Sequence, residues 1–430
     1  MNKYSQIFIF PNIAGFLFAT ALRRAGKKVL VVSHPVAKAD TMPDIIGAAV
    51  YMPEIFSQDI SYFGLPEPSV GPPQPLSLTI AGKEVLLEPD KARQVLAYAH
   101  ALPDLDRQLM RILDRLEASS ERMMPRLKAL YHTLPGKRSL GHKFAKKSIL
   151  FPFRSDPLRD LPKSVDGDVA RWALRIPAYL SLGIQGVAGG LKAVAVGYGF
   201  RSPHFCGFNS AKLAVEAEHL YLGEGGDVIE TRNDSDITIN FGGSTSVAQI
   251  DGTEIFFDRA FIGKDTAARA LAAHEGVIDK LYGLTMLSQS FPWTPPKGWG
   301  PSAPRHGAIV TDVNRPPIND NLVLYSISPA EKEPCTVTAA VTVEREETLS
   351  EHFIQRRRGY FLGRMASNFA LAMRGIADIQ PAPATRLFPP IKLTGRAKFR
   401  FLDDNLIPGN TVEDVVRYAR WLSLRSEFVM

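Results

Sequence analysis

The chain has 430 residues, of which 45% are hydrophobic and 22% are charged, and its formal net charge is +7. This length can bury a large core and is expected to form two or three closely connected domains. Two cysteines, Cys206 and Cys335, are too few for a disulfide framework, and neither they nor the nine histidines have metal-ligand spacing. We therefore expect a cytoplasmic protein without a metal site. No run of about 18 apolar residues predicts a spanning helix.

The N-terminal residues 1–34 predict a strand–helix–strand unit. The fully apolar run QIFIF is typical of a buried parallel strand, and residues 13–25 predict a helix that Gly26 would end. The run KKVLVV then predicts a second buried strand. Because parallel strands need a helical crossover, the three elements are expected to form a βαβ unit.

This unit carries an incomplete dinucleotide fingerprint. The motif G-x-G-x-x-G would place its glycines at Phe10, Asn12 and Gly15, and only Gly15, which permits close packing of helix and strand, is present. Phe10 replaces the glycine of the tight turn, and Asn12 puts a side chain where a pyrophosphate would lie. Ser33 and His34 replace the acidic residue that bonds the ribose hydroxyls. These residues leave open both a generic βαβ unit and a working dinucleotide site.

A basic segment follows between Arg126 and Arg154. Lysines and arginines alternate there with Leu, Tyr and Phe, and no acidic residue occurs. One interpretation is a solvated lid. The other is an interfacial segment in which Lys137–Lys147 contacts an anionic membrane. Nucleic acid is not expected as a partner, because no recognition module accompanies the charge.

Two further regions predict core elements. The apolar, glycine-rich residues 178–200 are expected to form core or the wall of a substrate tunnel. Farther along, the dipeptide Asp251-Gly252 predicts a hairpin turn between two strands that follow a strand at DVIE. The runs LVLYSIS and CTVTAAVTV, rich in β-branched residues, predict a pair of strands.

The C-terminal stretch FRFLDDNLIPGNTVEDVVRYARWLSLR has three features in a fixed order. Asp403-Asp404 ends a strand, Pro408-Gly409 follows in a loop, and NTVEDVVRYA begins a helix. This order resembles the closing motif of the FAD-dependent amine oxidase and phytoene desaturase superfamily. The resemblance implies that Asp404 matches the acidic residue near the ribityl-phosphate of the flavin, and that Asp403 and Asp414 replace glycines.

The resemblance extends in element order over nearly the whole chain and implies a fold. The class is α/β, a Rossmann-like FAD/NAD(P)-binding domain with a discontinuous mixed-sheet substrate domain. The first domain would comprise residues 1–75, 205–275 and 395–430. The second would comprise 76–204 and 276–394, with a helical lid at about 95–200. The residues at cofactor-binding positions are Asn12, Gly15, Ser33, Asp404 and Thr411.

Three hypotheses for function follow. The first is a protein of this fold that binds, carries or isomerises a lipophilic small molecule, with no cofactor expected because the FAD site is degraded. The alternative is an FAD-dependent oxidoreductase, a desaturase or oxidase acting on a lipophilic substrate. The third is an NADP-binding protein in which His34, Lys38 and Arg23-Arg24 meet a 2′-phosphate.

A group of acidic residues near the start of the last helix is a candidate for acid–base chemistry. If Asp403, Asp404, Glu413 and Asp414 were buried together, their like charges would raise at least one pKa and supply an acid or base. Alternatively some of them cap the helix or face solvent. No catalytic residue is nominated, because a flavin itself would carry the chemistry.

Overall fold

The computed structural model describes fifteen parts of the chain, and every structural statement below concerns these parts. They are residues 3–35, 49–132, 157–187, 191–199, 201–207, 210–232, 234–242, 245–262, 284–294, 304–318, 321–328, 335–344, 391–395, 399–401 and 411–424.

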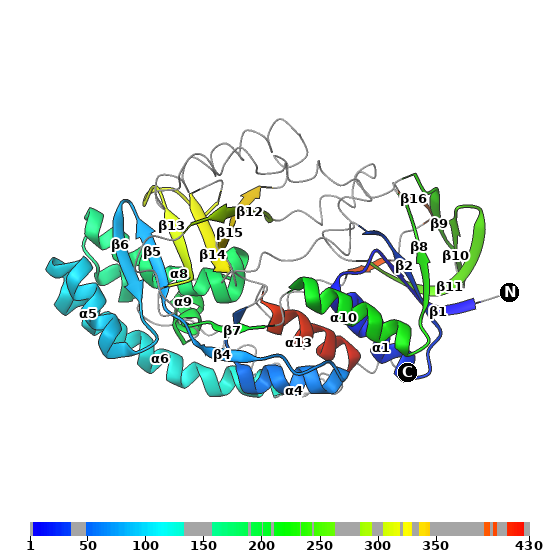
Figure 1. Cartoon of the computed structure of the whole chain (residues 1–430), viewed down its shortest axis with the longest axis horizontal. Helices are drawn as coiled ribbons and strands as arrows, with labels where there is room; N and C mark the ends of the chain where they lie inside the picture. Colours follow the sequence, from blue (N-terminus) through cyan, green and yellow to red (C-terminus); the bar gives the residue numbers. More distant parts are fainter. Residues whose placement is uncertain are drawn as a thin grey trace.

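The first sheet contains eight of the described strands and has the order β16-β9-β10-β11-β1-β2-β8, with β17 also beside β11 (Figure 1). Strands β11, β1, β2 and β8 are parallel, with β8 at one end of the order, while β9, β10 and β11 form an antiparallel meander. The strand bounds are β1 Lys3–Ile9, β2 Val29–Ser33, β8 Asp227–Glu230, β9 Ile237–Phe241, β10 Ser246–Ile250, β11 Thr253–Ile262, β16 Ile391–Gly395 and β17 Phe399–Phe401.

The predicted βαβ unit is confirmed. Helix α1 spans Ile13–Arg24 and joins β1 to β2, which pair in parallel. Gly26 follows the helix end with a left-handed φ of 76°, the conformation expected of a helix-terminating glycine. Gly15 is buried within α1.

Each face of this sheet carries an apolar cluster. Neighbouring residues of a strand point to opposite faces, so one strand contributes to both clusters. Phe8 of β1 faces the helices, while Ile7 and Ile9 belong to the apolar cluster on the other face. The first face is covered by α1, α10 (Ser210–Gly223) and α13 (Val412–Ser423), and α4 (Pro53–Phe63) packs on α13. Figure 1 shows α13 in red between α10 and α4.

The second sheet lies at the other end of the molecule and has the order β12-β15-β14-β13-β5-β6 (Figure 1). The predicted pair of strands is confirmed, since β14 and β15 are antiparallel neighbours. A small sheet, β3-β7-β4, lies between the two large ones. The bounds are β5 Leu76–Ile80, β6 Lys83–Leu87, β12 Leu284–Trp293, β13 His306–Val310, β14 Leu322–Ser328, β15 Cys335–Glu344, β3 Ala49–Val50, β4 Val70–Pro73 and β7 His204–Cys206.

The hairpin predicted at Asp251-Gly252 is also confirmed. Strands β10 and β11 pair across it with Ile250 opposite Thr253. Asp251 and Gly252 have φ angles of 49° and 81°, the two left-handed residues that a type I′ turn requires.

Four helices and the second sheet share one apolar core. Helices α5 (Lys91–Ala101), α6 (Asp106–His132), α8 (Val165–Val187) and α9 (Leu191–Gly199) contribute to it, together with the short turns η1 (Pro103–Leu105) and η2 (Pro157–Asp160). The segment predicted as core or tunnel wall lies in α8 and α9, where Tyr179, Leu180, Val194, Ala195 and Tyr198 are buried core residues.

Gly197 marks the closest approach of α8 and α9. A Cβ added at Gly197 would lie 2.2 Å from the Cα of Ala178, so a side chain cannot fit without moving backbone. We expect Gly197→Val to lower the free energy of unfolding by about 1–3 kcal/mol or more, as overpacking does. Chemical denaturation measures this loss. Gly223→Val at the end of α10 is the control, because open space surrounds that position, and equal losses at both sites would contradict the prediction.

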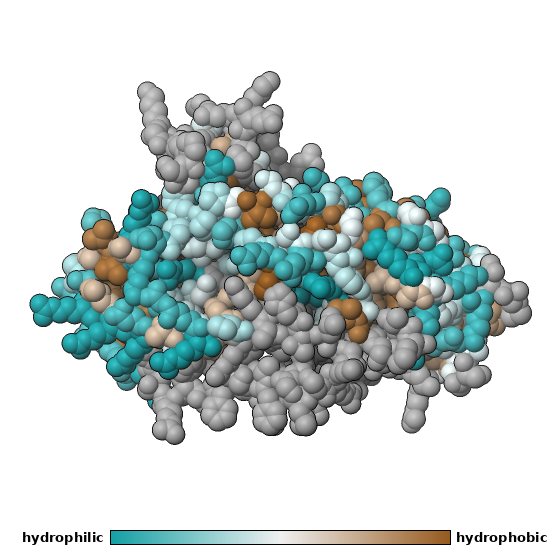
Figure 2. All heavy atoms as spheres, turned by 90° about the horizontal axis from the view of Figure 1, so that it is seen from below, coloured by the Kyte–Doolittle hydropathy of each residue, from teal (hydrophilic) through white to brown (hydrophobic). Residues whose placement is uncertain are grey.

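No described helix is long and apolar enough to cross a membrane. Large apolar side chains exposed on the surface include Leu96, Met110, Val165, Val215 and Leu222. On the face seen from below, apolar residues lie scattered among hydrophilic ones (Figure 2). The basic segment Lys137–Lys147, predicted to contact an anionic membrane, lies outside the described residues.

Candidate dinucleotide site

The turn after β1 contains an aromatic residue where the fingerprint has its first glycine. Phe10, at the position of the first fingerprint glycine, has a left-handed φ of 47°. Its N–H donates to the carbonyl of Val32 at 2.8 Å, and its fully buried ring belongs to the apolar cluster on the face of the sheet opposite α1. The ring of His34 lies 5.7 Å from it, edge to face. The tight turn is therefore preserved, and the Phe10 side chain packs in the hydrophobic core.

The N-terminus of α1 is capped by its own sequence. Asn12, the residue before the helix, has an extended backbone, and its Oδ1 accepts the N–H of Gly15 at 3.0 Å. This is the usual role of an N-cap asparagine, which takes up one of the helix's unpaired amides. In a dinucleotide site those same amides point at the pyrophosphate. The structure thus brings Asn12 and Gly15 together, but the Gly15 amide is hydrogen-bonded to Asn12 and does not point at a pyrophosphate site.

The end of β2 offers no carboxylate and little access. Ser33 and His34 are each 1% exposed. The Ser33 carbonyl accepts both the N–H and the hydroxyl of Thr231 at 2.9 Å. Its own hydroxyl has no hydrogen-bond partner among the described residues. A ribose needs an accessible acceptor for its hydroxyls, and this strand end does not supply one.

The arginines considered for a 2′-phosphate lie at the opposite end of α1. Arg23 donates to the carbonyl of Gly225 at 2.7 Å, and Arg24 donates to Glu224 at 2.7 Å. The helix has 12 residues, so about 18 Å of helix separates them from Asn12. This placement gives the NADP alternative no support from Arg23-Arg24. Lys38 lies outside the described residues.

The N-terminus of α13, the helix that carries the C-terminal motif, is also closed by side chains. Thr411 is fully buried and forms a capping box with Asp414. The Asp414 N–H donates to the Thr411 hydroxyl, whose oxygen lies 2.7 Å from the Asp414 carboxylate, and the Thr411 N–H donates to the same carboxylate. The interpretation that an acidic residue caps this helix therefore holds for Asp414. Asp403 and Asp404 lie outside the described residues.

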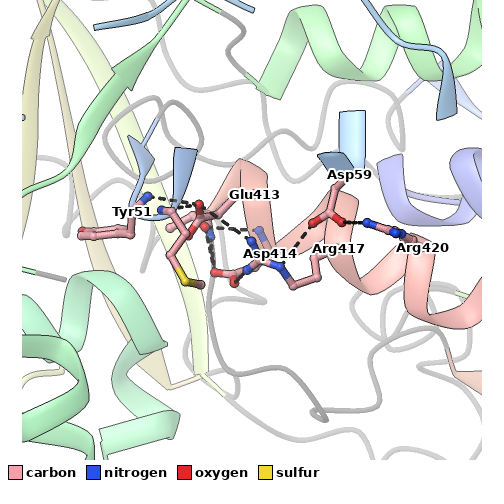
Figure 3. A network of polar contacts seen from close by, with 8 residues as sticks. Tyr51, Asp59, Glu413, Asp414, Arg417 and Arg420 are labelled. Atoms are coloured by element: carbon pink, nitrogen blue, oxygen red, sulfur yellow. Dashed lines mark hydrogen bonds and ion pairs between the residues drawn. The ribbon is translucent and has the colours of Figure 1, made fainter. Parts of the chain in front are cut away.

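A buried network of charges extends from this cap (Figure 3). The carboxylate of Glu413 accepts the backbone N–H groups of Tyr51 and Met52, just after β3, at 3.1 and 2.9 Å. Arg417, one turn later on α13, lies 3.4 Å from Asp414 and 3.2 Å from Asp59 of α4. We call the five charged residues the α13 cluster: Asp59, Glu413, Asp414, Arg417 and Arg420.

Arg420 completes the network from the surface side. Its guanidinium lies 2.7 Å from the second oxygen of Asp59 and stacks over the ring of Tyr62 at 5.2 Å. Figure 3 shows Asp59 between the two arginines. The cluster therefore ties α13 to α4 and to the residues after β3.

Burial dominates the acid–base properties of the α13 cluster. Loss of hydration, followed by the nearby charge of Glu413, raises the pKa of Asp414 to about 7. Loss of hydration also raises the pKa of Glu413 and of Asp59, although Arg417 opposes both shifts. The hypothesis that acidic residues here are buried together and that like charge raises at least one pKa is supported for Asp414, whose pKa the neighbouring Glu413 raises, with burial as the larger cause.

Sequence reasoning did not find Asp59, Arg417 or Arg420. Arg417 lies three and four residues after Asp414 and Glu413, which places it on the same face of the helix. That spacing could have predicted the ion pairs within α13. The partner Asp59 is 358 positions from Arg417 in the sequence, and no local pattern connects the two.

Several solved structures are similar to this architecture. A putrescine oxidase bound to putrescine matches with a TM-score of 0.54 at 12% identity, over 98% of each chain. A protoporphyrinogen oxidase-like protein from Exiguobacterium sp. 255-15 matches with a TM-score of 0.51 at 11% identity, also over 98% of each chain. The chain has the FAD-binding fold of the amine oxidases. No family model and no curated protein matches the sequence.

The amine oxidase fold implies FAD, yet the residues described here do not fit its dinucleotide half. The α1 amide of Gly15 is bonded to Asn12, the turn carries Phe10, whose buried ring packs on the sheet face opposite α1, and the β2 end presents buried Ser33 and His34. The predicted binding roles of Asn12, Gly15, Ser33, Asp404 and Thr411 stay predictions. Among the described residues no group of His, Cys, Asp or Glu side chains could hold a metal ion.

Proposed function

We propose that this protein uses the amine oxidase fold without FAD and binds or carries a lipophilic small molecule. The observation that carries the proposal is the capped N-terminus of α1. Asn12 accepts the N–H of Gly15 there, at the helix end where a dinucleotide's pyrophosphate would be bound.

Two further features support the loss of FAD. The rings of Phe10 and His34 contact each other at the turn and at the end of β2, where a ribose would need access. At the other helix, Thr411 and Asp414 close the first turn of α13, and Asp414 adds a buried carboxyl group beside Glu413. Each feature alone weakens binding, and together they act on separate parts of the cofactor.

The lipophilic ligand is supported by the sequence. The resemblance to phytoene desaturases and the apolar residues 178–200 favour such a ligand, and the basic residues 126–154 favour its uptake at an anionic membrane. The alternative, an FAD-dependent oxidoreductase, is favoured by the match to oxidase structures over 98% of the chain.

The flavin content of the purified protein separates these two functions. We expect a flavin-to-protein ratio far below one after purification in excess FAD, and no saturable change in flavin fluorescence on titration. Lost charged hydrogen bonds of about 1.5–3 kcal/mol each correspond to roughly tenfold or more in affinity apiece. A ratio near one would overturn the proposal and establish the oxidoreductase.

A pair of variants tests the role of the cap itself. Asn12→Gly frees the Gly15 amide at a cost to the helix of only a few tenths of a kcal/mol, whereas Asn12→Ser keeps a capping oxygen. We expect FAD to bind more tightly to Asn12→Gly than to Asn12→Ser. Mass spectrometry of organic extracts from the wild-type protein tests the ligand, and an extract without any stoichiometric apolar compound would count against the carrier role.

A further inference from the structure

The α13 cluster contains more acidic than basic groups. Three carboxyl groups, Asp59, Glu413 and Asp414, share two guanidinium groups, Arg417 and Arg420. Four of the five residues are almost completely buried, and only Arg420 is partly exposed. An unbalanced charge in such a place is costly, because burial removes its hydration. One bound proton would bring the cluster to neutrality.

The geometry assigns that proton to Asp414. Asp59 lies between both arginines, at 3.2 and 2.7 Å, and Glu413 accepts two backbone N–H groups, so each of these two carboxylates is stabilised as an anion. Asp414 has one guanidinium at 3.4 Å, a single backbone N–H, that of Thr411, at 3.3 Å, and the Thr411 hydroxyl at 2.7 Å, a group that can accept as well as donate. Of the three carboxyl groups, Asp414 therefore gives up the least stabilisation from its neighbours when it is protonated.

We infer that Asp414 is a buried proton switch that controls how firmly the first turn of α13 holds the chain segment after β3. With the proton bound, the cluster is neutral and Glu413 keeps its hydrogen bonds to Tyr51 and Met52. Without the proton, two adjacent carboxylates repel each other at the helix start, and opening this turn to water relieves the repulsion. This inference does not depend on the proposed function.

The titratable groups that face Asp414 are Glu413 and Arg417 on α13 itself and Tyr51 after β3. Asp59 of α4 acts through Arg417, which it contacts, and through Glu413. Burial and the charges of Glu413 and Asp414 raise the pKa of the Tyr51 hydroxyl, which keeps it neutral throughout the relevant range. The charged residues of α1 are Arg23 and Arg24, which bond Gly225 and Glu224 instead.

The direction of the pH effect follows from the pKa of Asp414. It is raised from 3.8 to about 7 in the folded protein. The contribution of the proton to stability is therefore fully present below about pH 4 and declines as the pH rises toward 7. Over that interval the equilibrium for opening should increase by up to about tenfold per pH unit.

Hydrogen exchange of peptides that cover Tyr51 and Met52 measures this opening. After correction for the intrinsic exchange rate, we expect protection of these two amides to fall by at least about tenfold between pH 5 and pH 8. Asp414→Asn, which keeps the capping oxygen but does not titrate, should show much less pH dependence. Asp414→Ser is the second variant, should the asparagine protein fail to fold. Glu224→Gln, at an exposed ion pair, is the control and should behave as wild type.

Two results would overturn the inference. One is a wild-type protein whose protection at Tyr51 and Met52 is the same at both pH values. The other is a folded Asp414 variant, Asn or Ser, that retains the full pH dependence of the wild type.

Discussion

Replacing Arg417 with methionine is expected to lower the free energy of unfolding by about 3–5 kcal/mol at pH 7. Arg417 is 2% exposed and is the cation that contacts all three carboxyl groups of the α13 cluster. Methionine fills much of the same volume, so the loss comes from uncompensated buried charge and not from a cavity. Urea denaturation of the two proteins at equal concentration measures the difference.

The pH dependence of this loss identifies its cause. Without Arg417 the carboxyl groups take up protons more readily, so the difference between variant and wild type should shrink at pH 5. Arg24→Met provides the matched control, because Arg24 forms a surface ion pair with Glu224 that is worth about 0–1 kcal/mol. A loss for Arg417→Met that stays below about 1 kcal/mol would show that the cluster is better hydrated than its burial implies.

Phe10→Ala is expected to cost about 3–5 kcal/mol of unfolding free energy, and Phe10→Gly less. Two effects oppose each other at this position. Removing a fully buried aromatic ring costs the packing of the apolar cluster around it. Relieving a left-handed φ of 47° returns about 1–2 kcal/mol, and only glycine adopts that conformation freely. The packing loss is larger, so both variants should be less stable than wild type.

The difference between the two Phe10 variants measures the backbone strain. Thermal unfolding should place Phe10→Gly above Phe10→Ala by about 1–2 °C. A glycine variant more stable than wild type would mean that the turn, and not the core, determines this residue. In that case the presence of Phe10 would not count against a cofactor binding at the turn after β1.

Elements with strong local signals were predicted well. The βαβ unit, the Asp251-Gly252 hairpin and the β14–β15 pair each depend on a short run of residues, because strand, helix-end and turn preferences act over few positions. The overall FAD-binding fold was recognised from the order of elements and from the C-terminal motif. The division into domains and the cofactor-binding roles remain predictions.

The candidate site was predicted only in part, for a physical reason. The substitutions at Phe10 and Asn12 were visible in the sequence, but the direction in which each side chain points was not. Phe10 turns to the far face of the sheet, and Asn12 turns back onto its own helix. The link between Arg417 and Asp59 depends on how α13 packs on α4, which no local pattern fixes.

The position of α13 in the chain affects how the protein can be made. In the first sheet β2 pairs with β8, β1 pairs with β11, and α1 packs against α13, so the N-terminal unit meets its partners about 200 to 390 residues later. Ribosomes add about 5–20 residues per second, which leaves α1 without its last neighbour for roughly 20–80 s. Folding dominated by such distant contacts is also slow. During synthesis the apolar strands β1 and β2 therefore have unpaired edges until their partners are made. A nascent chain in this condition is prone to aggregate unless a chaperone binds it.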